Sequence, residues 1–276
     1  APRKKEMKAA AISMAKKAER LGVDIRMNTK VTPEMIEEIK PHTVMNAIGA
    51  ESIIPPIPGV DKAFVKDSHD VLDGKAEATG NVVVIGGGMV GMETAEYLAE
   101  KGAKVSVLEM LPDICSDMGT TRKICMGEEI QKSGIIPVTS IKVTEIGDNV
   151  VIGEKDGEKV EFPCDTAVLA IGAKKRDGSA LAETCYKNGI GYFEIGDAAM
   201  ARRAINATRE AMDAALTFDR EDVHRDVSKP KKLVFITGAS GMMGGQTLKQ
   251  LLARPNRFKV RALRRPSDKN RVFAKK

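Results

Sequence analysis

The sequence predicts an α/β fold built on a parallel, doubly wound sheet. Three observations predict it. Residues 81–85 form an apolar, strand-like stretch that runs into a glycine-rich turn, an alanine-rich helical stretch follows at about 92–101, and a second apolar strand at 104–108 ends in Glu109. A strand, a helix and a second strand in this order give parallel neighbours in one sheet, joined by a right-handed crossover.

The glycine-rich turn has the spacing Gly-x-Gly-x-x-Gly. Gly86 allows the tight turn, Gly88 lets a pyrophosphate approach the backbone, and Gly91 lets helix and strand pack closely. The phosphates are expected at the positive end of the helix. Glu109 follows Gly86 by 23 residues, where a carboxylate accepts hydrogen bonds from ribose hydroxyls and repels a 2′-phosphate. We therefore expect a Rossmann unit that binds NADH rather than NADPH; a glycine turn beside a surface glutamate is the simpler alternative.

The first eighty residues also alternate helix and strand. Apolar side chains recur at helical spacing over 5–21, and 23–27 reads as a short strand. Thr32, followed by a proline, indicates the start of a second short helix, and 43–47 reads as a buried strand. The proline-rich stretch 53–59 lacks the amide donors that a central strand needs, so it is expected to be an extended connector.

Beyond the first Rossmann unit the pattern changes from helix and strand to short strands. Alternating stretches at 141–146, 149–154 and 159–162 predict a small antiparallel ribbon, with Asp156-Gly157 at one turn. Residues 165–171 read as a further buried strand.

The C-terminal part repeats the strand, loop and helix order. Residues 219–232 are almost wholly polar and contain a proline, which predicts a linker before a strand at 233–236. A glycine loop, a helix at 246–253 and a strand at 258–263 follow. The loop is expected to hold a second dinucleotide, and two arginines after the last strand favour NADPH; a basic surface is the alternative. The residues expected to contact it are Thr237, Gly238, Gly241, Gly244, Arg264 and Arg265.

Composition narrows the classes of partner. The 276 residues are 42% hydrophobic and 30% charged, and no apolar run approaches the roughly 18 residues of a membrane span. No signal-peptide core follows the basic start, so we expect a cytoplasmic protein without a membrane partner. Residues 221–276 hold 15 Lys and Arg against 4 Asp and Glu, but stacking aromatics are scarce. This asymmetry favours two unlike domains over a nucleic-acid-binding tail.

The four cysteines are widely scattered, at positions 115, 125, 164 and 185. No pair has the short spacing of a zinc site, an iron–sulfur cluster or a redox dithiol, so no metal site is expected. Reduction of a disulfide through a flavin needs two closely spaced thiols, and the sequence offers none.

Several segments in combination resemble one flavoprotein family. These are Val44–Ala50, the prolines of 55–59, the glycine loop with Glu93, Glu194–Ala198 and Arg202–Ala207. Residues 1–218 resemble the C-terminal half of NADH:flavin oxidoreductases of the old yellow enzyme-like enoate reductase and 2,4-dienoyl-CoA reductase family. The resemblance implies FAD and NADH as cofactors, with hydride transfer from NADH to FAD. It also implies a partner barrel domain or subunit, carrying FMN and an iron–sulfur cluster, that reduces an enoate-type substrate.

The resemblance assigns roles to individual residues but no catalytic side chain. Asp197 is expected to hold a hydroxyl of the ribityl-pyrophosphate region, with a helix cap as its simpler role. Glu93 is similar to the family glutamate near the nicotinamide and flavin rings, with a favourable interaction with the helix dipole as its alternative role. The residues expected at the FAD site are Ala47, Gly49, Gly196 and Asp197, and Gly172 is expected to bind a dinucleotide cofactor.

Parts of the family pattern do not occur in the sequence. The barrel, its cysteine cluster and the first FAD glycine loop are missing, and residues 233–276 resemble the opening of an extended short-chain dehydrogenase/reductase without its Tyr-x-x-x-Lys pair. We expect a Rossmann-like NAD-binding domain inserted in a partial FAD-binding domain, and then a truncated second Rossmann unit. The expected boundaries are 1–80 and 173–218 for the FAD-binding domain, 81–172 for the NAD-binding domain, 219–232 for the linker and 233–276 for the last unit.

Two other functions stay open. One is a non-catalytic dinucleotide-binding remnant, since Rossmann folds host many functions. The other is a fragment of an NADPH-dependent reductase or epimerase centred on the C-terminal unit.

Overall fold

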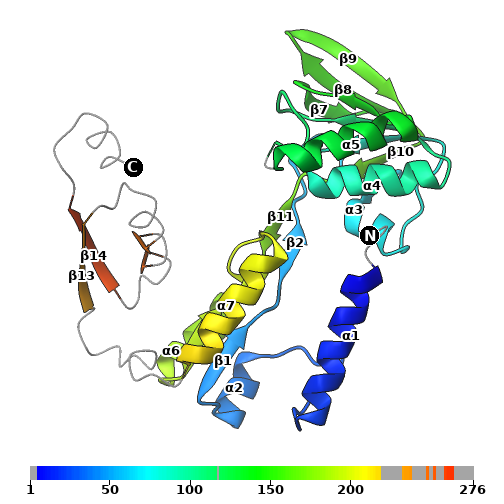
Figure 1. Cartoon of the computed structure of the whole chain (residues 1–276). Coiled ribbons are helices and arrows are strands. Elements are labelled where there is room, and N and C mark those ends of the chain that lie inside the picture. The colour runs from blue at the N-terminus through cyan, green and yellow to red at the C-terminus, as the bar shows by residue number, and fades with distance from the viewer. Residues whose placement is uncertain are drawn as a thin grey trace. The chain divides into compact units, whose positions relative to one another are not determined.

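The structure, a computed structural model, divides into two compact units. It describes residues 5–116, 118–218, 232–237, 247–248, 251–252 and 258–263. Among these, the residues up to 30, 48–176 and 197–203 form the first unit, and 31–47, 177–196 and the residues from 204 onward form the second. Figure 1 labels their helices and strands along the chain. These two units are defined by contacts within the chain, whereas the domains expected from the sequence are defined by the cofactor that each binds. The expected domain boundaries therefore stay predictions.

The first unit contains a five-stranded parallel sheet in the order β3-β10-β4-β5-β6. Its strands are β3 (Val65–Asp67), β4 (Asn81–Ile85), β5 (Lys104–Leu108), β6 (Ile136–Val138) and β10 (Thr166–Leu169). From β4 the chain builds β5 and β6 on one side and then returns to place β10 on the other. The strand order therefore reverses between β4 and β10, which is where doubly wound sheets bind ligands. The predicted parallel α/β fold is confirmed.

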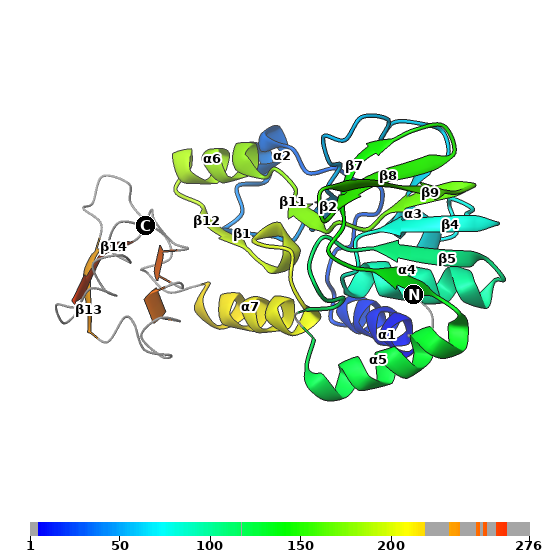
Figure 2. The same ribbon diagram turned by 90° about the horizontal axis from the view of Figure 1, so that it is seen from above.

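Both faces of this sheet are covered. Figure 2 shows α4 (Met89–Glu100) and α5 (Thr120–Ser133) on one face and the three-stranded sheet β7-β8-β9 on the other. Successive side chains of a strand point to opposite faces. Val84 accordingly joins the cluster on the helix side, and Val83 joins the cluster that contains Ile146 of the small sheet. This explains why β4 is apolar along its length instead of alternating.

The small sheet is the antiparallel ribbon expected from the sequence. Its strands are β7 (Lys142–Ile146), β8 (Val150–Lys155) and β9 (Glu158–Pro163). Asp156 and Gly157 join β8 to β9 with φ angles of 53° and 83°, the two positive values that a tight hairpin turn requires.

The first unit contains four further elements among its described residues. They are α1 (Lys5–Arg20), α3 (Ser68–Leu72) and the antiparallel pair of β2 (Ala50–Ser52) with β11 (Ala173–Lys175). The expected strand at 23–27 is wrong, because it pairs with none of the described strands. The apolar side chains of this stretch are exposed, and Met27 is 77% exposed. The alternation of apolar and polar residues was therefore not a sign of a buried strand.

The second unit is built around a parallel strand pair. Its elements are α2 (Pro33–Ile39), β1 (Thr43–Asn46), α6 (Ser179–Lys187), β12 (Gly191–Glu194) and α7 (Ala204–Thr217), with β1 paired to β12. Thr32 caps α2 by accepting a hydrogen bond from the Met35 N–H at 3.4 Å, as its position before a proline predicts. The 3-10 turn Gly196–Ala198 lies at the division between the units. The strands β13 (Lys232–Thr237) and β14 (Phe258–Leu263) also form a parallel pair.

Tyr192 ties β12 to its neighbours through a half-buried hydroxyl. The hydroxyl accepts a hydrogen bond from Asn46 Nδ2 at 2.8 Å and donates to the Gly178 carbonyl at 3.3 Å. Burial, the larger effect, raises the pKa of Tyr192 to about 12, although the hydrogen bond from Asn46 opposes the shift.

Replacing Tyr192 with phenylalanine is expected to lower the free energy of unfolding by about 1–3 kcal/mol at neutral pH. The buried Asn46 amide loses this acceptor, and urea unfolding measures the loss. Tyr186→Phe is the matched control, because this ring packs edge-on against Tyr192 and keeps that contact without its hydroxyl. Equal losses in the two variants would contradict the interpretation.

The same variant should change how stability depends on pH. The folded-state pKa of Tyr192 lies above its unfolded value near 10, so the protonated hydroxyl stabilises the fold fully below pH 10. That contribution is lost as the pH rises from 10 towards 12. Wild type should therefore lose stability more steeply over this window than Tyr192→Phe.

Candidate functional site

The glycine loop between β4 and α4 has two positions that only glycine fits. Gly86 has a φ of +108°, and an added Cβ would lie 2.5 Å from the Ala170 carbonyl oxygen, just beyond β10. An added Cβ on Gly91 would lie 1.9 Å from the Gly86 carbonyl oxygen, inside the loop itself. The first glycine is thus required by the turn and the last by the contact between helix and loop.

Gly88 differs from these two. Its φ and ψ of −72° and −177° suit any residue, and an added Cβ would meet nothing within 4 Å. It is the N-cap residue of α4, where backbone N–H groups and the helix dipole favour an anion. The open space next to the Gly88 Cα would let a phosphate approach the backbone.

Glu109 lies directly after β5 and is joined to the loop. Its Oε2 accepts a hydrogen bond from the Gly87 N–H at 2.6 Å, and its Oε1 accepts one from the Leu111 N–H at 2.8 Å. An ionised carboxylate accepts about four hydrogen bonds, so capacity remains for ribose hydroxyls. Sequence reasoning missed Gly87, whose added Cβ would lie 2.9 Å from the Glu109 Cβ. Three consecutive glycines were the available signal.

The residues expected at the FAD site, and Gly172, are divided between the units. Gly49, Gly172 and Asp197 belong to the first unit, and Ala47 and Gly196 to the second. All three glycines have positive φ angles. In the first unit, Asp197 Oδ1 accepts a hydrogen bond from the Arg202 N–H at 3.1 Å, and the Gly172 carbonyl accepts one from the Ile53 N–H at 3.0 Å.

Glu93 is half-buried on α4, close to the glycine loop. Its expected place near the nicotinamide and flavin rings stays a prediction.

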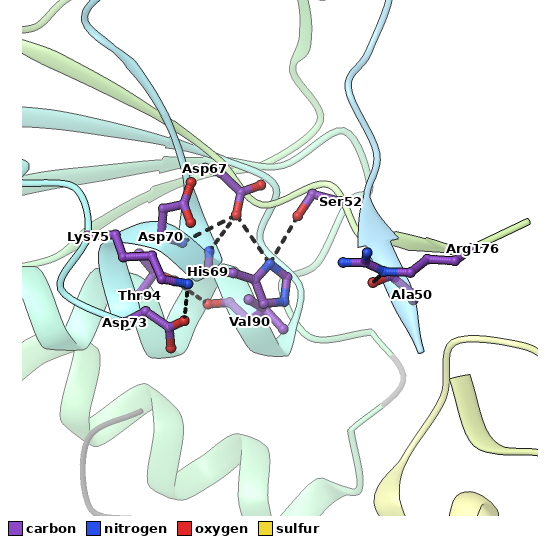
Figure 3. A network of polar contacts seen from close by, with 10 residues as sticks. All are labelled: Ala50, Ser52, Asp67, His69, Asp70, Asp73, Lys75, Val90, Thr94 and Arg176. Atoms are coloured by element: carbon purple, nitrogen blue, oxygen red, sulfur yellow. Dashed lines mark hydrogen bonds and ion pairs between the residues drawn. The ribbon is translucent and has the colours of Figure 1, made fainter. Parts of the chain in front are cut away.

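A cavity of about 890 Å³ lies within the first unit. It is bounded by the β2–β11 pair and by the carboxyl ends of β3 and β10, and Asp197 lines it. Ser52, Asp67 and His69 meet at its wall, as Figure 3 shows. Sequence reasoning missed these three residues because no local pattern connects them. The cavity therefore shares the carboxyl edge of the sheet with the glycine loop.

The expected second dinucleotide site is mostly outside the described residues. Thr237 is the last residue of β13, whereas Gly238, Gly241, Gly244, Arg264 and Arg265 lie outside that part of the chain. Thr247, Leu248, Leu251 and Leu252 are helical, within the helix expected there.

The cysteines are free thiols in the described part of the chain, with Cys125 exposed and the other three buried. Burial raises the pKa of the Cys164 thiol to about 11. No group of three His, Cys, Asp or Glu that could hold a metal ion occurs among the described residues. Within the same residues, no helix is long and apolar enough to cross a membrane.

The fold and the loop geometry define an α/β dinucleotide-binding protein. Comparison with known families is more specific: the chain belongs to the pyridine nucleotide-disulphide oxidoreductase family, which matches residues 5–199. This family binds FAD and NAD(P)H, in agreement with the cofactors expected from the sequence.

Individual relatives are reductases and oxidases of greater length. Bilirubin reductase of Mediterraneibacter gnavus is 42% identical over 173 residues, which are 63% of this chain and 27% of that protein. NADH oxidase of Thermoanaerobacter brockii is 39% identical over 201 residues, 71% of this chain and 31% of that protein. The solved complex of 2-naphthoyl-CoA reductase with 2-naphthoyl-CoA has a TM-score of 0.68 at 28% identity, and the match covers 74% of this chain and 31% of that one. The chain thus spans 27–31% of the length of these relatives.

Proposed function

We propose that this chain receives electrons from NADH and passes them to FAD within a larger oxidoreductase. The observation that carries the proposal is the open space above Gly88 beside the Glu109 carboxylate, in a chain whose family binds both cofactors. When bound, NADH supplies a hydride, which is one proton with two electrons, and FAD accepts it.

The residues of this chain supply binding and orientation. Gly88 and the first N–H groups of α4 hold the pyrophosphate, and Glu109 accepts hydrogen bonds from the ribose hydroxyls next to the adenine. Glu109 repels the 2′-phosphate of NADPH, which sets the preference for NADH. Ala47, Gly49, Gly196 and Asp197 hold the flavin, Gly172 contacts one of the two cofactors, and Glu93 lies near the reacting rings.

The electrons continue, in this proposal, to an enoate-type substrate. The resemblance to old yellow enzyme-like reductases supports an FMN and iron–sulfur barrel as the next carrier, in the same protein or a partner subunit. The names of two relatives give bilirubin and 2-naphthoyl-CoA as the molecules that they reduce. Both molecules contain conjugated double bonds, which favours an unsaturated substrate here. A dithiol substrate site is disfavoured by the wide spacing of the four cysteines.

We also propose the domain organisation 1–80 and 173–218 for flavin, 81–172 for NADH, 219–232 as linker and 233–276 as a second nucleotide unit. The parallel pairing of β13 with β14 favours that second unit, because parallel neighbours need a crossover between them. It resembles the start of an extended short-chain dehydrogenase, and Arg264 with Arg265 favour NADPH there.

Anaerobic titration tests electron transfer directly. The chain is loaded with FAD, freed from unbound flavin by gel filtration and mixed with NADH. We expect flavin to stay with the protein and its visible absorbance to bleach, and NADPH to bleach it far more slowly. Retention of NADH without flavin in equilibrium dialysis would instead support a non-catalytic dinucleotide-binding protein. The same titration with Gly88→Ala is the control for flavin reduction by NADH that is not bound at the glycine loop.

A further inference from the structure

His69 lies at the wall of the cavity, with its Nδ1 beside two polar side chains (Figure 3). Ser52 Oγ lies 3.1 Å from His69 Nδ1, and Asp67 Oδ1 lies 3.4 Å from the same nitrogen. Asp67 Oδ1 also accepts the backbone N–H groups of His69 at 2.8 Å and of Asp70 at 3.4 Å. The carboxylate is therefore fixed at the start of α3, and two groups anchor one side of the imidazole ring.

This anchoring determines what the other side of the ring offers. An ionised carboxylate only accepts hydrogen bonds, so Asp67 favours a proton on Nδ1, and a neutral ring in that form leaves Nε2 as an acceptor. A protonated ring offers an N–H at Nε2 instead. In both states Nε2 is the ring atom turned away from Asp67 and Ser52, as Figure 3 shows, and the ring lines the cavity.

The strand order indicates which part of a dinucleotide reaches this cavity. Along the carboxyl edge of the sheet, Glu109 follows β5, the glycine loop follows β4, and Asp67 ends β3 on the far side of β10. Neighbouring strands are about 4.8 Å apart, so β5 and β3 are separated by about 14 Å. With its adenine ribose at Glu109 and its pyrophosphate at the loop, NADH would extend its other half towards β10. That half is the nicotinamide riboside, and this step rests on the proposed function.

The chemistry of the cavity matches that end of the molecule. The nicotinamide ring carries a carboxamide, which has one oxygen acceptor and two N–H donors, so it pairs with Nε2 in either protonation state. Asp197, the residue proposed to hold the flavin, lines the same cavity. A nicotinamide ring bound in this cavity would therefore share it with Asp197, the residue proposed to hold the flavin.

We propose that His69 binds the nicotinamide carboxamide through Nε2 and thereby sets the orientation of the ring. Ser52 and Asp67 are positioning residues that act through His69. The glycine loop and Glu109 are proposed to bind the opposite half of the dinucleotide. The role of Ser52, Asp67 and His69 is therefore separate from theirs.

The test compares two ligands that differ at this end. NADH contains the nicotinamide, and ADP-ribose is the same molecule without it. Dissociation constants of the full chain are measured for both by isothermal titration calorimetry. We expect His69→Ala to weaken NADH binding about 5–10-fold, as for one hydrogen bond, and to leave ADP-ribose binding within about twofold of wild type. Ser52→Ala should weaken NADH binding about twofold, again without an effect on ADP-ribose.

Two further variants complete the design. His69→Gln places an amide near the former Nε2 and should restore part of the NADH affinity, which a merely structural role would not predict. His42→Ala, at an exposed histidine of the second unit, is the matched control and should change neither constant.

The outcomes separate this inference from the proposed function. Equal losses for NADH and ADP-ribose in His69→Ala, or no loss for either, would overturn the role of His69 while the dinucleotide site stands. A wild-type chain that binds neither ligand would overturn both proposals. If the wild-type chain binds ADP-ribose as tightly as NADH, the nicotinamide end makes no contact with the protein. That result would overturn the role of His69 but not the dinucleotide site.

Discussion

Gly91→Ala is expected to lower the free energy of unfolding by about 2 kcal/mol and to abolish NADH binding. An alanine Cβ would lie 1.9 Å from the Gly86 carbonyl oxygen and 3.3 Å from the Ala170 Cβ, so the start of α4 must move away from the loop. Overpacking of this kind costs about 1–3 kcal/mol, and the better helix propensity of alanine offsets at most about 1 kcal/mol. Urea unfolding and NADH titration measure the two effects.

Gly88→Ala is the matched control in the same loop. Its Cβ meets no protein atom within 4 Å, and its backbone conformation suits alanine, so stability should fall by no more than about 1 kcal/mol, the cost of a poorer N-cap. NADH binding should nevertheless weaken at least about tenfold, because the methyl group fills the space proposed for the pyrophosphate. A Gly88→Ala chain that binds NADH as wild type does would place the phosphates elsewhere.

Glu109→Arg is expected to reverse the preference between the two coenzymes. The variant loses the acceptor for the ribose hydroxyls, and its guanidinium can pair with the 2′-phosphate of NADPH. Hydrogen bonds to charged groups contribute about 1.5–3 kcal/mol each, so the ratio of NADH to NADPH affinity should fall by about 100-fold. Dissociation constants for both coenzymes give this ratio.

Glu109→Gln separates charge from shape at the same position. The amide keeps one oxygen acceptor but presents an NH₂ group to either the Gly87 or the Leu111 N–H, which also donates. NADH affinity should fall about tenfold without a gain for NADPH. If Glu109→Arg still strongly favours NADH, the carboxylate only fixes the loop, and the proposed ribose contact is wrong.

Local sequence order was enough to predict the central unit of the fold. The strand, the glycine loop and the helix around Gly86 are contiguous, and the turn requires Gly86 while the contact between helix and loop requires Gly91. The ribbon at 141–162 could also be predicted, since its strands are neighbours in the chain and Asp156-Gly157 marks a turn.

Elements that depend on distant partners could not be predicted in this way. Ser52 of β2 pairs with Ala173, and Val65 of β3 with Ala167, each more than a hundred residues later. Three-residue strands carry too few residues for a periodic signal. The contact of Ser52 with His69 depends on these pairings, so the wall of the cavity became visible only in the structure. The stretch 23–27 is the opposite case, a strand pattern without a described partner.

The hydrogen bond between Glu109 and Gly87 links coenzyme choice to the shape of the phosphate cradle. The side chain that would select the ribose also holds the backbone of the loop that would receive the pyrophosphate. A substitution that changes the first property therefore disturbs the second. An efficient change to NADPH in this protein, whether by evolution or by engineering, requires at least one compensating substitution that restores the support of the loop.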